Sequence, residues 1–184
     1  MSVRLETHRL MIRSFTESDG DSWLALVNDP DVSRYTPDTG VSTLEDFIGA
    51  LARRRRLEQE RGFAMWAVEL RDTGEFIGQC GLYPAEGKGP EIELAYHFLP
   101  VTWGKGIATE AAVAALAHGF GTVGLDEVIA LVIPANIGSR QVAEKARMRL
   151  VTDDATYYSI CHLRKYAADR GPWLAAHAAI ADRA

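Results

Sequence analysis

Hydrophobic positions along this chain switch between the period of strands and the period of helices. Alternation with period two predicts strands over residues 8–14, 63–70, 75–82 and 91–98, and a more continuous apolar run predicts a buried strand over 127–133. A closing hairpin is predicted over residues 150–156 and 159–167. Helical spacing predicts helices over 42–60, 108–118 and 139–146, and the alanine-rich tail from Pro172 onward favours another. On the first of these helices, Leu44, Phe47, Ile48, Leu51 and Leu57 are spaced to form one apolar face.

Turn and capping residues mark the breaks between these elements. Residues 16–19 are typical of a helix start, and residues 72–74 are typical of a hairpin turn. Two prolines and a glycine predict that residues 29–40 form a loop. No repeat or linker divides the chain, so we expect a single domain over residues 1–184.

Composition and charge exclude some classes of protein. The 184 residues, 47% hydrophobic and 24% charged, are ordinary for a globular protein. The net charge of −5 argues against binding to DNA. No apolar run approaches the ~20 residues that span a membrane, and charged residues interrupt the N-terminus where a signal peptide would stand. We therefore expect a cytoplasmic protein whose two cysteines, Cys80 and Cys161, are reduced core residues.

The segment from Trp103 to Glu110 carries the strongest chemical signal. It joins a strand to a helix and places Lys105 between Gly104 and Gly106. Glycine lets the backbone approach an anion closely, and the first N–H groups of a helix lack partners in the chain. The segment therefore predicts a cradle for a pyrophosphate.

Known phosphate motifs do not explain this segment. A P-loop has Ser or Thr after its Gly-Lys pair, and a dinucleotide fingerprint has a third glycine where this chain has Thr109. A Gly-Lys-Gly turn that binds nothing remains an alternative.

Four ordered segments resemble the RimJ/RimL-type branch of the GNAT N-acetyltransferases. Residues 5–13 (LETHRLMIR) are similar to its L-E-T-E-R-L-x-L-R opening, with His8 in place of Glu, and residues 77–82 (IGQCGL) to its I-G-x-x-G-L strand. Residues 103–108 (WGKGIA) resemble its W-G-K-G-x-A loop, in which Trp103 departs from the general [QR]-x-x-G-x-[GA] pattern. Residues 136–145 resemble its N-x-x-S-x-x-[VL]-x-E-K segment.

The resemblance implies an α/β (α+β) fold with a GNAT-type mixed, largely antiparallel sheet, flanked by helices and splayed between its fourth and fifth strands. It implies acetyl-CoA as cosubstrate, with the pyrophosphate on backbone amides and the pantetheine arm on the backbone of the fourth strand and on Asn136. A helix cap without a cofactor role is the alternative for that Asn. The implied cofactor-binding residues are Tyr96, Phe98, Trp103, Gly104, Lys105, Gly106, Ile107, Ala108, Asn136 and Ser139.

Acetyl transfer to an amine requires a base that removes a proton from the amine. We favour Glu93, because it matches the Glu of the branch's E-x-G-Y strand. Glu91 shares its strand face and is the fallback, whereas Tyr96, His97 and Tyr35 are weaker candidates. A carboxylate on a solvated strand face is the alternative interpretation for either Glu.

The departing thiolate benefits from a proton donor. Many GNAT enzymes carry a Tyr seven residues after the Asn, but this chain has Ala143 there. Ser139 is the nearest substitute for this Tyr. It could donate the proton, orient the thioester, or act only as a helix N-cap without a chemical role.

The sequence thus predicts an N-acetyltransferase that passes acetyl from acetyl-CoA to a primary amine, either a protein N-terminus or a small molecule, in a ternary complex. The missing Tyr favours one alternative, a non-catalytic acyl-CoA sensor or scaffold. The histidines lack ligand spacing, so we expect no metal, and we expect no membrane partner and a monomer or homodimer. Residues 29–40 and 159–167 are expected to line the acceptor site.

Two basic features complete the prediction. Residues 53–56 are four arginines on a predicted helix; because consecutive helical residues point in different directions, we interpret the run as a solvated face, with an acidic partner as the alternative. Arg147 stands where the branch usually has Gly after the short helix, so we expect either backbone strain at Arg147 or a different closure of the helix.

Overall fold

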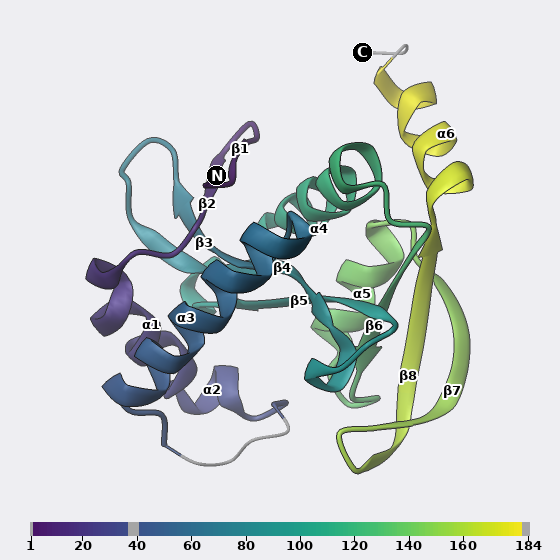
Figure 1. Ribbon diagram of the computed structural model, residues 1–184. Coiled ribbons are helices and arrows are strands. Elements are labelled where there is room, and N and C mark those ends of the chain that lie inside the picture. Colours follow the sequence, from purple (N-terminus) through teal and green to yellow (C-terminus); the bar gives the residue numbers. More distant parts are fainter. Residues whose placement is uncertain (1, 37–40, 182–184) are drawn as a thin grey trace.

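A mixed β-sheet with helices on both sides organises the molecule (Figure 1). The computed structural model describes residues 2–36 and 41–181, with side chains to residue 177. Within these residues eight strands follow the order β1-β2-β3-β4-β5-β6-β8-β7, and each neighbouring pair is antiparallel except β5 and β6. The strands are β1 (Arg4–Glu6), β2 (Leu10–Arg13), β3 (Met65–Leu70), β4 (Phe76–Pro84), β5 (Ile92–Phe98), β6 (Glu127–Val132), β7 (Arg149–Tyr157) and β8 (Ile160–Asp169).

The helices begin at the capping residues that the sequence offers. Thr43 and Asp46 form a capping box at the start of the long helix, which ends at Gly62 in the left-handed conformation (φ 78°). The α-helices are α1 (Gly20–Val27), α2 (Pro30–Ser33), α3 (Leu44–Arg61), α4 (Ile107–His118), α5 (Ile137–Lys145) and α6 (Arg170–Ala181). Short 3-10 turns η1 (Glu17–Asp19), η2 (Ala85–Gly87) and η3 (Pro100–Thr102) and a π-turn η4 (Gly119–Val123) complete the elements.

Each face of the sheet has its own apolar core. Alternate residues of β2 to β5 pack with the alanine-rich α4 and with α5 in the larger cluster, which includes Trp66 and Leu116. The opposite face, marked by Ala67, packs against α1 and the first half of α3 through Trp23 and Phe47. Successive side chains of β4 and β5 therefore point alternately toward α1 and α3 on one face of the sheet and toward α4 and α5 on the other.

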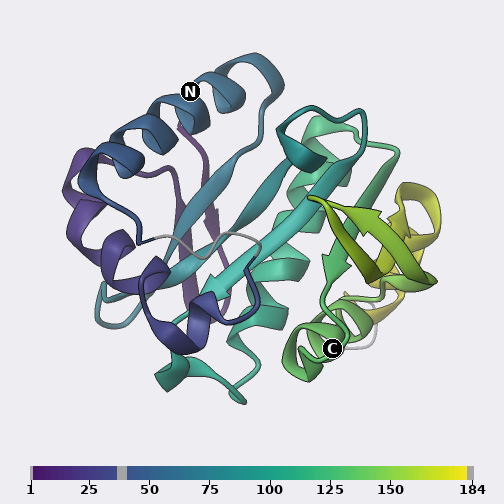
Figure 2. The same ribbon diagram turned by 90° about the horizontal axis from the view of Figure 1, so that it is seen from below.

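The sheet splits between β5 and β6. A single register pair, Glu93 with Ile129, joins these two parallel strands within the described residues, whereas the β4–β5 pair has seven. Figures 1 and 2 show the two strands diverging beyond this point. The predicted α+β fold and its splay between the fourth and fifth strands of the predicted order are confirmed.

Three local predictions are wrong. The predicted loop over residues 29–40 contains α2, capped by Asp29, while residues 37–40 lie outside the described residues. Cys80 is buried, but Cys161 is exposed, because it lies in the part of β8 that extends beyond the pairing with β6. Leu44 and Ile48 of α3 are 54% and 59% exposed, although their spacing predicts a buried face.

The predicted strain at Arg147 is confirmed. Its φ is 62°, in the left-handed region that favours glycine. The turn nevertheless closes as a C-terminal cap, since the Met148 N–H donates to the carbonyl oxygen of Ala143 at 3.0 Å. No helix in the described part of the chain is long and apolar enough to cross a membrane.

Candidate active site

The glycine cradle precedes α4 as the sequence predicts. Gly104 and Gly106 adopt φ values of 74° and 76°, and Gly106 is the N-cap of the helix. None of the amide N–H groups from Gly104 to Ala108 donates to another described residue. These donors and the positive end of the α4 dipole can therefore serve an anion.

A clamp from the N-terminal segment holds this cradle. Glu110, in the first turn of α4, accepts hydrogen bonds from Thr7 Oγ1 at 2.6 Å and from Arg9 N and Nε at 2.8 and 2.7 Å. The Arg9 guanidinium also donates to the carbonyl oxygen of Lys105 at 2.8 Å. The sequence contains both partners within its motifs, but only the fold shows that they meet.

The predicted pantetheine edge lies in the split of the sheet. Beyond Glu93, the β5 edge that faces β6 has no partner strand in the described part of the chain. Tyr96 and Phe98 lie on this stretch, and the carbonyl oxygen of Phe98 accepts a hydrogen bond from Trp103 Nε1 at 2.8 Å. The indole therefore ties the predicted cofactor loop to the end of β5.

The α5 helix brings Asn136 and Ser139 to the same split. Asn136 is the N-cap, and its Oδ1 accepts from Ser139 N at 3.0 Å. The interpretation of Ser139 as a cap is therefore wrong, because the helix begins at Ile137. Instead, the hydroxyl of Tyr96 lies 2.9 Å from both the carbonyl oxygen and Oγ of Ser139.

This hydroxyl pair borders the position of the missing Tyr. Ala143 lies one helical turn after Ser139 on the same face and is fully buried. Burial raises the pKa of Tyr96 above its usual range, although its hydrogen bond with Ser139 acts in the opposite direction. The phenol therefore stays protonated at neutral pH.

Glu93 lies on the other face of β5, in a cluster of tyrosines. Its Oε2 accepts a hydrogen bond from the Tyr158 hydroxyl at 2.6 Å, and that hydroxyl lies 3.0 Å from Tyr83 Oη. The residue is only 5% exposed, so the interpretation of Glu93 as a carboxylate on a solvated face is wrong. Burial raises the pKa of Glu93 to about 7, although the hydrogen bonds from Tyr158 and Tyr83 lower it in part.

Glu91 lies in a different environment, just before β5 begins at Ile92, so the predicted strand over residues 91–98 starts one residue too early. It forms an ion pair with Lys165 and accepts a hydrogen bond from Tyr157 Oη at 2.6 Å. Burial opposes its ionisation, but these two partners outweigh burial and hold the pKa of Glu91 below its ordinary value. A carboxylate that is already paired and fully ionised is a poorer base than Glu93 near neutral pH.

Tyr158 and Tyr83 are members of the site that the sequence did not reveal. Tyr158 lies at the tip of the β7–β8 hairpin with φ 54° and exchanges two hydrogen bonds with Glu86, of 2.9 and 2.8 Å. These bonds fix the hairpin against the β4–β5 connection, beside the start of β5 in Figure 2. The sequence predicted the hairpin that carries Tyr158. It did not predict the contact between Tyr158 and Glu93, because the two residues meet only in the folded chain.

The basic run on α3 also differs from its interpretation. Arg53, Arg55 and Arg56 are exposed, but Arg54 turns inward and donates to Gln79 Oε1 at 2.8 Å. The sequence contains one indication of this orientation. Arg54 follows the apolar residues Phe47 and Leu51 at helical spacings of four and three residues, so it lies on the same face of the helix. Of the weaker base candidates, His97 has its pKa lowered to about 4 by burial and by the charge of Arg54.

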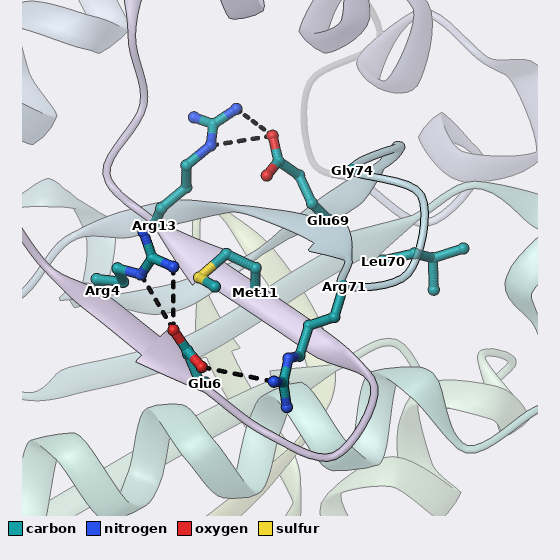
Figure 3. Close-up of a pocket in the computed structure, with 8 residues that line it drawn as sticks. All are labelled: Arg4, Glu6, Met11, Arg13, Glu69, Leu70, Arg71 and Gly74. Atoms are coloured by element: carbon teal, nitrogen blue, oxygen red, sulfur yellow. Dashed lines mark hydrogen bonds and ion pairs between the residues drawn. The ribbon is translucent and has the colours of Figure 1, made fainter.

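Other concave regions lack this chemistry. Figure 3 shows a pocket on β1 to β3 whose charged side chains pair with one another, Arg4 and Arg71 with Glu6 and Arg13 with Glu69. It contains no residue of the cradle or of the Glu93 cluster. No group of three or more metal-ligating side chains gathers anywhere in residues 2–36 and 41–177.

Comparison with known proteins agrees with this geometry. A family model described as an acetyltransferase (GNAT) domain matches residues 9–149. The chain belongs to the GNAT acetyltransferase family. The uncharacterized N-acetyltransferase YoaA of Bacillus subtilis is 30% identical over 141 residues, which are 77% of this chain and 80% of that protein.

Solved structures of GNAT proteins share the fold. A GNAT-family acetyltransferase from Bacillus anthracis superposes with a TM-score of 0.76 at 27% identity, over 91% of this chain and 99% of that one. RimJ of Mycobacterium smegmatis, in complex with CoA-disulfide, gives 0.72 at 20% identity, over 96% and 94% of the two chains. The GNAT family uses acetyl-CoA, and the chain is an N-acetyltransferase of this family, an acyltransferase.

Proposed function

We propose that this GNAT protein transfers acetyl from acetyl-CoA to a primary amine by direct attack in a ternary complex, with Glu93 as the base. One observation carries the proposal: a carboxylate with a pKa of about 7 is buried where β5 and β6 separate. A base with a pKa near the working pH is the most effective proton acceptor, because it is both available and sufficiently basic.

The cosubstrate is expected to cross the sheet at the split. The free amides from Gly104 to Ala108 and the charge of Lys105 would hold the pyrophosphate on the α4 side. The open edge of β5 at Tyr96 and Phe98 would pair with the pantetheine arm, and Asn136 would contribute its amide. RimJ of Mycobacterium smegmatis, which shares the fold, was solved in complex with CoA-disulfide, and this supports a CoA ligand for the present chain.

The Tyr96–Ser139 pair is proposed to protonate the departing thiolate. Tyr96 and Glu93 lie on opposite faces of β5, because strand residues an odd number apart alternate. A thioester held in the split would therefore have the donor on its α4/α5 side and the base on its α1/α3 side. The phenol at Tyr96 occupies the neighbourhood of Ala143 and supplies the hydroxyl that this position lacks.

We further propose that the chain is of the RimJ/RimL type, on the strength of its four motifs. The alternative is a non-catalytic acyl-CoA sensor, favoured by Ala143 alone. Calorimetric titration with acetyl-CoA, followed by thiol release in the presence of an amine panel, tests the two. Binding with amine-dependent thiol release supports the enzyme, and binding without any release supports the sensor.

A further inference from the structure

A chain of polar side chains on the α1/α3 face of the sheet is separate from the Glu93 cluster. Gln79 Oε1 accepts hydrogen bonds from Trp23 Nε1 at 3.2 Å and from Arg54 Nη2 at 2.8 Å. The Gln79 Nε2 lies 3.1 Å from His97 Nδ1. Gln79 and His97 are register partners on β4 and β5, so their side chains share one face.

This chain fixes the tautomer of His97. An indole N–H and a guanidinium N–H can only donate, so the Gln79 oxygen must face both of them. The Gln79 amide nitrogen then faces His97 and donates to Nδ1. Since the lowered pKa keeps the imidazole neutral, its proton is on Nε2. His97 is thus a fixed hydrogen-bond donor at Nε2.

The Nε2 donor is free to meet a ligand. His97 is partly exposed, and its Nε2 makes no hydrogen bond within the described residues. Nε2 also retains some exposed surface, in contrast to Arg54 Nη1, which is fully buried without a partner. A carboxylate that enters between β5 and the α1/α3 layer would therefore reach Nε2.

A buried positive charge lies behind this donor. Arg54 forms no direct ion pair among the described residues: Asp19, whose charge acts on it, pairs with Arg13, and Arg54 Nη1 is buried without an acceptor. Its guanidinium lies over the rings of Phe15 and Trp23, at 4.2 and 5.5 Å. A charge in such surroundings is weakly screened, so its field extends toward His97.

The donor and the base lie along one line. Glu93 and His97 are four residues apart on β5 and share a face, which separates their Cα atoms by about 13 Å. Under the proposed function, the amine of the acceptor binds at Glu93. The other end, where His97 lies near the charge of Arg54, attracts an anion. The spacing is too long for the amine and carboxylate of a single α-amino acid.

We propose that the acceptor is a zwitterion, an amine that carries a carboxylate several bonds away, and that His97 Nε2 donates to this carboxylate. Arg54 is a positioning residue that acts through Gln79 and through its charge. The inference rests on the proposed function, because it places the amine at Glu93.

Kinetics with matched acceptors test this specificity. Unbranched ω-amino carboxylates of increasing length are compared with alkylamines of the same length. We expect the carboxylates to give the higher kcat/KM, with an optimum at intermediate length. Arg54→Met should raise KM for the best carboxylate about tenfold or more and leave the alkylamine KM unchanged. Arg53→Met, on the exposed neighbour, should change neither.

A binding measurement separates this inference from the proposed function. The imidazole ¹H–¹⁵N NMR signals of the CoA-loaded protein, with His97 assigned through His97→Gln, should report an Nε2–H tautomer. This signal should shift with ω-amino carboxylates and not with alkylamines. A shift without any thiol release would overturn acetyl transfer and keep the site. Thiol release without a carboxylate preference, or an Nδ1–H tautomer, would overturn the inference.

Discussion

The hydroxyl of Tyr158 donates to Glu93 Oε2 at 2.6 Å across 65 residues of sequence. This bond stabilises the ionised carboxylate and so opposes the effect of burial on its pKa. The hairpin that carries Tyr158 therefore tunes the base, and the two reciprocal bonds with Glu86 hold the hairpin in place.

Removing this hydroxyl should shift the pH dependence of the reaction. In Tyr158→Phe the ionised form of Glu93 loses a donor, so its pKa rises above about 7. We expect the acidic limb of the kcat/KM profile to move to higher pH by about one pH unit, with acetyl-CoA affinity unchanged. Tyr157→Phe is the matched control, because Tyr157 contacts Glu91 and not Glu93. An identical shift in both variants would argue against a specific effect on Glu93.

Glu93 should cost stability in return for its function. Because its folded pKa is raised, the ionised carboxylate destabilises the fold above about pH 7, and the penalty disappears below about pH 4.5, where both states are protonated. Glu93→Gln should therefore raise the free energy of unfolding at pH 8 by on the order of 2–3 kcal/mol. Chemical denaturation at pH 8 and pH 4.5 checks this, and equal effects at both values would contradict it.

Two substitutions at Gly106 separate the effect of charge on CoA binding from the effect of backbone strain. Gly106 has a φ of 76°, so both Gly106→Ala and Gly106→Glu strain the turn. Only Gly106→Glu adds a negative charge at the start of α4. We expect at least tenfold weaker CoA binding for Gly106→Glu than for Gly106→Ala, since the charge repels the pyrophosphate. Isothermal calorimetry measures both affinities, and equal values would show that the segment from Gly104 to Ala108 does not bind the pyrophosphate.

The hydroxyl pair should act on the leaving group. Tyr96→Phe and Ser139→Ala should each lower kcat, and acyl donors with more acidic thiols should rescue the loss. We expect the effect of Ser139→Ala to be smaller than that of removing the base, because a thiol with a pKa of about 8.5 leaves readily. Turnover with a series of thioesters measures this dependence. A loss confined to cofactor affinity would make Ser139 a binding residue only.

Local sequence predicted the parts of the site that depend on local geometry. Gly104 and Gly106 predicted a cradle because positive φ and free helix amides are properties of a short segment. Glu93 followed from its strand and its motif. The caps at Thr43 and Asn136 also follow from neighbouring residues.

The remaining parts depend on contacts between distant residues. Tyr158 reaches Glu93 only because β7 and β8 fold back across β6, which no local pattern specifies. Arg54 was predicted to be solvated with its neighbours, but a helix directs one residue in each turn inward. There Arg54 meets Gln79, 25 residues later in the chain.

The pH–rate profile of Glu93→Gln decides whether Glu93 is the base of the reaction. If Glu93 is the base, kcat at neutral pH should fall by about 10²–10⁴-fold, the acidic limb near pH 7 should disappear, and the Kd for acetyl-CoA should stay nearly the same. Glu91→Gln is the matched control, two residues before Glu93 in the chain, and should keep the limb. An unchanged rate and profile in Glu93→Gln, or a larger loss in Glu91→Gln, would show that Glu93 is not the base.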